Sequence, residues 1–210
     1  MEILDTKYDF IVKLDADLIV PENYFETIIT IFKNNPTIGV AGGFAYEKND
    51  EGIWKLNHPM NKDHVRGAFK AYTRACFKQI GKLKNSIGWD TVDELLAQCY
   101  GYTIYTDSNL HIKHLRPTGK SYNTKARYMQ GEAMYKMRYG WTITLIAALK
   151  IAVKNKQVSS FLNTTKGYYH SKKNKVPFIV TKEEGRFIRQ HRWRGIFNKF
   201  ALKKISLLLN

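Results

Sequence analysis

Residues 10–17 constrain the fold of this chain more than any other segment. The run Phe10-Ile11-Val12-Lys13-Leu14 predicts a buried strand, and Asp15-Ala16-Asp17 follows where that strand must turn. Two carboxylates at such an edge suit a divalent cation, because Mg²⁺ and Mn²⁺ prefer hard oxygen ligands and in turn hold phosphates. Taken alone, the triplet is more typical of a solvated strand end than of a metal site.

Strand-like and helix-like segments alternate after this point. A helix is expected over 24–32, because Pro21-Glu22-Asn23 is a good opening and Asn34-Asn35-Pro36 a stop. Further strands are expected at 38–46, 53–54, 65–69, 102–106 and 111–115, with a turn at 107–109, and further helices at 72–80 and from 90 to 99. The alternation predicts an α/β fold.

The composition changes in the second half. From residue 122 the pattern predicts mostly helices, at 125–141, 142–153 and 182–200, with a polar loop after 153. The last helix is opened by a capping box, Thr181-x-x-Glu184.

The positive charge is confined to this second half. Residues 1–105 carry 12 Lys and Arg against 14 Asp and Glu, whereas residues 106–210 carry 22 against 4, which gives the net charge of +16. A basic half rich in aromatic residues indicates an anionic membrane surface or nucleic acid, and the missing nucleic-acid motif disfavours the latter. Packing is the favoured role of 125–153, while packing and lipid binding stay equally open for 186–209.

Cysteine use and hydropathy favour a cytoplasmic protein, with peripheral attachment at the inner face of the membrane as a further option. Cys76 and Cys99 are the only cysteines and lack metal-ligand spacing. The first residues do not resemble a signal peptide, and the apolar stretch at 141–153 is shorter than the ~20 residues of a membrane span.

Three segments carry chemistry: Asp15/Asp17, Gly88-Trp89-Asp90-Thr91-Val92-Asp93-Glu94, and His114-Leu115-Arg116-Pro117-Thr118-Gly119. Three further motifs accompany them: Gly42-Gly43, Arg66-Gly67-Ala68, and Gly101-Tyr102, which lies eleven residues beyond Asp90. Together these segments resemble the family 2 glycosyltransferases. That family consists of inverting, nucleotide-sugar-dependent enzymes of the GT-A fold. The resemblance covers residues 8–119.

The resemblance implies a site for Mn²⁺ or Mg²⁺ and a nucleotide-sugar donor. It makes Asp17 and His114 the metal ligands, and it places Asp15 near the ribose or on the metal through a water molecule. Arg66 and Gly67 join Asp15 and Asp17 as donor-binding residues. Judged alone, His114 is more typical of a surface or hydrogen-bonded histidine.

Asp90 matches the family's general base, which takes the proton of the acceptor hydroxyl, and Asp93 is the second candidate. The sequence departs from the pattern at Trp89, where glutamate is common. An Asp90/Asp93 pair is also an ordinary helix start.

The expected fold is an incomplete GT-A-type, Rossmann-like mixed sheet with a C-terminal helical extension. Residues 1–120 would form the C-terminal part of the transferase domain and 121–210 a basic helical tail. Only nine residues precede the first strand, so most of the nucleotide-binding half is expected to be missing and donor binding to be poor.

The expected acceptor is a cell-surface glycan or a lipid-linked acceptor. Two alternatives remain: an inactive remnant or partner subunit that needs a separate N-terminal chain, and a basic module that binds membrane or nucleic acid.

Overall fold

The computed structural model describes residues 7–57, 64–116 and 126–208. The chain divides into two compact units, the first formed by Met1–Asn85 with Trp89–Lys120 and the second by Ser86–Gly88 with Ser121–Asn210.

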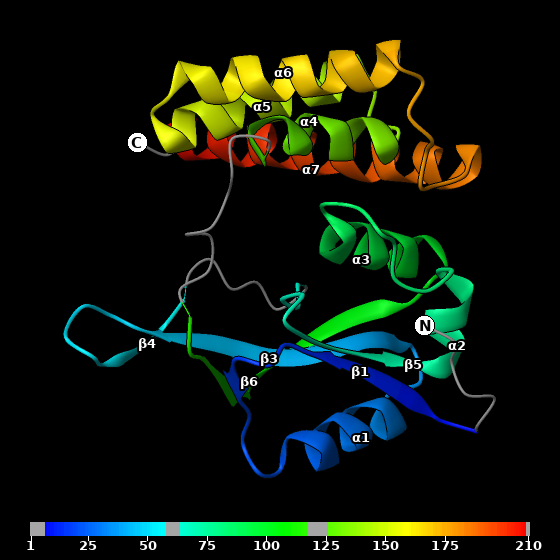
Figure 1. The fold of residues 1–210 in the computed structure, drawn as a ribbon, viewed down its shortest axis with the longest axis vertical. Coiled ribbons are helices and arrows are strands. Elements are labelled where there is room, and N and C mark those ends of the chain that lie inside the picture. The colour runs from blue at the N-terminus through cyan, green and yellow to red at the C-terminus, as the bar shows by residue number, and fades with distance from the viewer. Residues whose placement is uncertain (1–6, 58–63, 117–125, 209–210) are drawn as a thin grey trace. The chain divides into compact units, whose positions relative to one another are not determined.

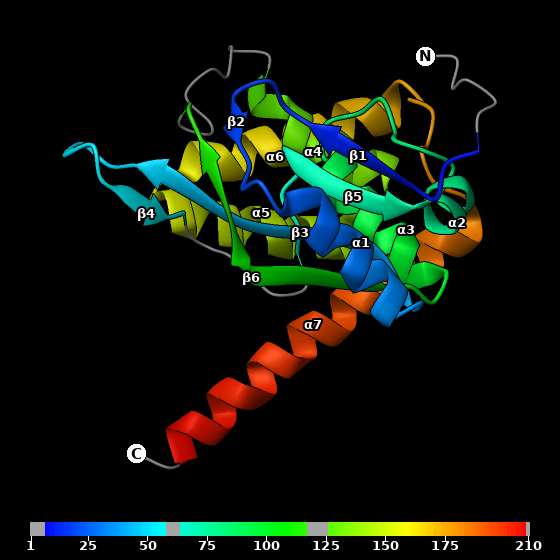
Figure 2. The same ribbon diagram turned by 90° about the horizontal axis from the view of Figure 1, so that it is seen from below.

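The first unit is built on a mixed six-stranded sheet (Figure 2). Its strands are β1 (Phe10–Leu14), β2 (Leu18–Ile19), β3 (Ile38–Lys48), β4 (Trp54–Leu56), β5 (Phe69–Thr73) and β6 (Thr103–His114). The order is β1-β5-β3-β6-β2, and β4 pairs with the far end of β3. Only β3 and β6 run parallel, while every other pair is antiparallel.

Helices cover both faces of this sheet. Figure 1 shows α1 (Tyr24–Asn34) on one face and α3 (Trp89–Cys99) on the opposite face, and α2 (Arg74–Gln79) follows β5. Tyr24 and Ile28 of α1 are fully buried, as are Val92 and Leu96 of α3. The covered sheet explains why β3 and β5 are buried along most of their length. The predicted α/β class is confirmed.

Two predicted strand boundaries are wrong. The chain is a loop at Val65 to Ala68, and the strand expected there begins only at Phe69 and runs to Thr73, where a helix had been expected to start. The Thr73 hydroxyl accepts the Cys76 N–H and caps α2, which fixes the boundary.

The predicted turn at 107–109 lies inside one continuous strand. The register of β6 on β3 jumps from Asp107 opposite Gly43 to His111 opposite Phe44, so three residues of β6 bulge out of the ladder. A Cβ on Gly43 would lie 2.3 Å from the Leu110 carbonyl oxygen. The glycine therefore makes room for the bulge.

The second unit consists of four helices, α4 (Ala126–Lys136), α5 (Trp141–Asn155), α6 (Val158–Lys173) and α7 (Lys182–Leu208). The loop expected after residue 153 is wrong, because α6 occupies most of it. The helix expected over 125–141 ends at Lys136, since Arg138 and Gly140 adopt left-handed backbone angles. None of the helices in the described part of the chain is long and apolar enough to cross a bilayer.

The capping box of α7 is confirmed. The Thr181 N–H donates to Glu184 Oε2 at 2.7 Å, and the Glu184 N–H donates to Thr181 Oγ1 at 3.2 Å. These reciprocal bonds satisfy two N–H groups at the helix start.

Helices α4 and α6 cross through two glycines. A Cβ on Gly131 would lie 1.9 Å from the Thr164 carbonyl oxygen, and one on Gly167 would lie 2.1 Å from that of Tyr128. The two backbones are therefore in direct contact, and the contact depends on the missing side chains.

We expect Gly131→Ala to lower the free energy of unfolding of the second unit by about 1–3 kcal/mol or more, because the added methyl group forces α4 and α6 apart. Gly195→Ala in α7 is the matched control, since a Cβ there meets no atom within 4 Å. Thermal unfolding followed by circular dichroism should show a loss for the first variant and none for the second. Equal melting temperatures would contradict the close crossing.

Candidate active site

The sheet topology brings the ends of several segments to one edge. β1 ends at Leu14 opposite Phe69, the first residue of β5, and the Asp15 N–H donates to the Ala68 carbonyl at 2.9 Å. β6 ends at His114, which pairs with Leu18 on one side and Glu47 on the other. The sequence-predicted residues therefore lie along one edge because their strands end there.

Asp17 and His114 are brought together, 97 positions apart in the chain (114 − 17). His114 Nε2 lies 3.4 Å from Asp17 Oδ1, and Nδ1 lies 3.7 Å from Glu47 Oε1. Glu47 Oε1 also accepts from Arg66 Nη1 at 3.2 Å. An imidazole that faces a carboxylate on each nitrogen is held in one orientation, which is the usual setting of a metal-binding histidine.

Asp15 faces a different partner. Its carboxylate forms an ion pair with Lys13, whose ammonium lies 5.1 Å from the centroid of the Trp89 ring. Lys70 lies directly opposite Lys13 on the neighbouring strand and is 5.9 Å from the same ring. Cross-strand partners point to the same face of a sheet, so Trp89 is placed against two cations that would otherwise repel each other. The Trp89 ring therefore contacts the ammonium groups of both lysines.

Gly67 lies against the first turn of α3. A Cβ on Gly67 would lie 2.9 Å from Asp90 Cβ and 2.9 Å from an atom of the Trp89 ring. Asp90 is half-buried at this contact. The structure thus brings together Gly67 and Asp90, a predicted donor-binding residue and the predicted base.

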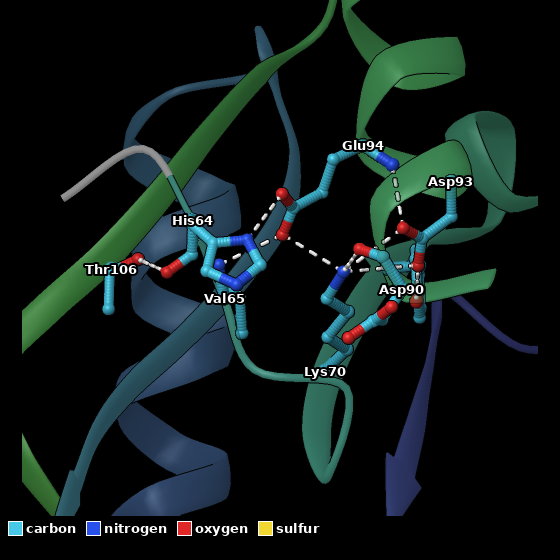
Figure 3. A network of polar contacts seen from close by, with 8 residues as sticks. His64, Val65, Lys70, Asp90, Asp93, Glu94 and Thr106 are labelled. Carbon is cyan, nitrogen blue, oxygen red and sulfur yellow. Dashed lines mark hydrogen bonds and ion pairs between the residues drawn. The ribbon is translucent and has the colours of Figure 1, made fainter. Parts of the chain in front are cut away.

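Behind Asp90 lies a buried network of charges centred on Lys70 (Figure 3). The fully buried Lys70 ammonium pairs with Asp93 at 3.0 Å and Glu94 at 2.9 Å, and it also donates to the Asp90 carbonyl oxygen. Tyr72 donates its hydroxyl to Asp93. One cation thereby ties β5 to the first turn of α3.

The same network holds the loop that contains Arg66 and Gly67. Glu94 accepts the Val65 N–H at 2.9 Å, and its other oxygen lies 2.8 Å from His64 Nδ1. Thr106 of β6 donates to the His64 carbonyl at 3.1 Å. Figure 3 shows the Glu94 carboxylate between the His64 ring and the Lys70 ammonium. The hydrogen bond that the His64 ring donates to the Glu94 carboxylate raises the pKa of His64.

Asp93, the second candidate for the base, lies inside this network. It is 1% exposed, and Lys70 and Tyr72 contact its carboxylate oxygens. Burial raises its pKa, although Lys70 and Tyr72 oppose that change. A carboxylate so enclosed is placed to support α3, and this placement favours Asp90 as the residue that faces a substrate.

Sequence reasoning missed Lys70, His64 and Glu47, and it named Glu94 only as an acidic neighbour of Asp90. Two signals were available for the network: Lys70 interrupts an apolar strand, and Asp93 and Glu94 fall within the apolar stripe of α3. No comparable signal marks Glu47, because its role depends on the register of β3 against β6.

The residues at this edge fit a divalent cation that binds together with a diphosphate. No group of three or more potential metal ligands occurs among residues 7–57, 64–116 and 126–208. Asp17 and His114 provide two ligands, and Mg²⁺ and Mn²⁺ commonly use few protein ligands and complete their shell with phosphate oxygens and water. Residues 117–119 of the His-Arg-Pro-Thr-Gly motif lie outside the described residues.

Comparisons with known proteins find similarity to solved structures and none at the level of sequence families. No protein-family model matches the sequence, and no curated protein matches it. The chain is similar to the mannosyltransferase PcManGT from Pyrobaculum calidifontis, whose structure contains GDP-mannose and Mn²⁺, with 11% sequence identity and a TM-score of 0.42. The similarity covers 92% of this chain and 57% of that one, so the chain spans little more than half the length of its structural neighbour.

We expect Lys70→Met to lower the free energy of unfolding by about 3–5 kcal/mol, because it leaves the Asp93 and Glu94 carboxylates buried without their cation. Lys55→Met is the matched control, since Lys55 is exposed on β4. Urea unfolding of the three proteins tests this. A loss no larger than that of the control would show that the network is not essential to the fold.

We expect the His64–Glu94 pair to stabilise the fold more in acid than in alkali. The folded-state pKa of His64 is raised from 6.5, so its stabilising contribution is complete below that value and is lost as the pH rises through the raised pKa. The difference in unfolding free energy between the wild type and His64→Gln should shrink from about pH 5.5 to about pH 8.5. His170→Gln, at an exposed position of α6, should show no such trend.

Proposed function

We propose that this chain is the catalytic part of a metal-assisted glycosyltransferase that moves a sugar from a nucleotide-sugar donor to a glycan or lipid-linked acceptor with inversion. The observation that carries the proposal is the 3.4 Å approach of Asp17 and His114 at the same sheet edge as Asp90. Convergence of an acid and an imidazole from segments far apart in the sequence supports a shared ligand better than either residue alone.

Asp90 is the proposed general base. It accepts the proton of the acceptor hydroxyl while that oxygen forms a bond to the anomeric carbon, and the bond from that carbon to the diphosphate oxygen breaks with its electron pair. The half-buried position of Asp90 and its support by Lys70 favour this role over one for Asp93.

The remaining residues are proposed to bind the donor. Asp17 and His114 would hold Mn²⁺ or Mg²⁺, which neutralises charge on the leaving nucleoside diphosphate. The Arg66 guanidinium, oriented by Glu47, is suited to a phosphate oxygen, and Gly67 lets the loop that carries Arg66 pack closely against Asp90. Asp15 would contact the ribose or a metal-bound water.

We expect Asp90→Asn to slow release of nucleoside diphosphate by about 10²–10⁴-fold, because the base is removed while the donor contacts remain. A panel of UDP-sugars and GDP-mannose with Mn²⁺ serves as the donor, and released UDP or GDP is measured. Asp50→Asn, at an exposed turn, is the matched control and should be unchanged.

We expect Asp17→Asn to weaken Mn²⁺ binding in the presence of UDP or GDP by about tenfold or more, because one of two protein ligands loses its charge. Electron paramagnetic resonance of free Mn²⁺ measures this without any need for turnover. Unchanged Mn²⁺ affinity in Asp17→Asn, together with unchanged release of nucleoside diphosphate in Asp90→Asn, would overturn the proposal.

A further inference from the structure

The helical hairpin formed by α5 and α6 exposes aliphatic side chains at the turn that joins the two helices. Val153 is 70% exposed and Val158 75% exposed, and they flank the turn at Lys156 and Gln157. One helical turn further from it, Leu149 is 59% exposed and Leu162 49% exposed. These four residues are named here the hairpin face. Leu149 and Val153 differ from the packing role that the sequence favours for residues 125–153, and Val158 and Leu162 lie where a polar loop was expected.

Within each helix of the hairpin, the exposed apolar residues lie close together. Leu149 and Val153 are four residues apart on α5, as are Val158 and Leu162 on α6, so each pair lies on one side of its helix. The turn is tight, because Lys156 adopts a left-handed conformation and the Gln157 N–H donates to the Ala152 carbonyl at 3.0 Å. Leu145 and Ile146 extend the apolar surface along α5.

The charge around the hairpin face has a single sign. Residues 133–182 contain ten Lys and Arg and no Asp or Glu. Lys150 and Lys154 each follow an exposed apolar residue of α5, and Lys156 occupies the turn, all three being exposed. Long lysine side chains beside an apolar patch can extend their ammonium groups toward an anionic layer while their methylenes stay with the patch.

We propose that the hairpin face docks on the surface of an anionic lipid bilayer, with its aliphatic side chains at the headgroup boundary and Lys150, Lys154 and Lys156 on the lipid phosphates. A second copy of the chain fits less well, because a symmetric contact would bring the lysines of both copies close together. Nucleic acid fits less well too, since aliphatic side chains give bases no ring to stack on. The inference is independent of the proposed catalytic activity.

The test is flotation of the full chain with vesicles of phosphatidylcholine and phosphatidylglycerol, and with vesicles of phosphatidylcholine alone. The wild type should float with the anionic vesicles, less so as salt is raised, and should not float with the neutral ones. The triple variant Lys150→Gln, Lys154→Gln, Lys156→Gln should partition roughly one hundredfold less, at about fivefold per lysine. The double variant Leu149→Gln, Val153→Gln should lose about tenfold or more.

Matched variants in the first unit separate the hairpin face from general surface effects. Ile53→Gln removes an apolar residue of similar exposure, and Lys55→Gln removes an exposed lysine, and neither should change flotation. All variants should have the melting temperature of the wild type, because every substituted side chain is exposed.

Three results would overturn the proposal. One is equal flotation with neutral vesicles, and another is an equal loss in the matched variants. The third is absence of flotation by a chain that instead forms a dimer sensitive to Leu149→Gln in sedimentation equilibrium, or that binds a single-stranded oligonucleotide.

Discussion

The Lys70 ammonium is the interaction on which the first unit depends. It is fully buried between Asp93 and Glu94, and a charge in that position is tolerated only because both carboxylates and the Asp90 carbonyl surround it. The pairing fixes where α3 begins relative to β5. Through Glu94 it also holds the backbone of Val65, so the start of the helix and the adjacent loop are set by one buried cation.

Around that cation, the candidate site is assembled from the ends of several strands rather than from any one element. Side chains of the site lie where the strand pairing of β1, β3 and β6 ends. The start of α3 and the loop before β5 lie at the same edge of the sheet. Gly67 shows how closely these parts fit, since a single methyl group there would meet both Asp90 and Trp89. The geometry of the site is therefore a property of the packed unit.

Particular elements show how far the sequence could be followed. Helix α1 and the α7 capping box were predictable, because apolar spacing and capping residues act over a few positions. The segment at 65–69 was predicted as a strand, but residues 65–68 form a loop. Its Val65 N–H donates to the Glu94 side chain instead of to a neighbouring strand. Helix α6 was missed because its polar residues lack strong periodicity and it is fixed by the Gly167 contact with α4.

By itself, the sequence determined the α/β class, the charge division between the halves and the residues that could carry chemistry, since these follow from local pattern and residue type. The tertiary structure decided which of those residues meet. It paired Asp17 with His114 and enclosed Asp93 beside Lys70, while Asp90 stayed half-exposed. Such distinctions depend on strand register and burial, which arise from contacts between residues far apart in the chain and leave no local signature.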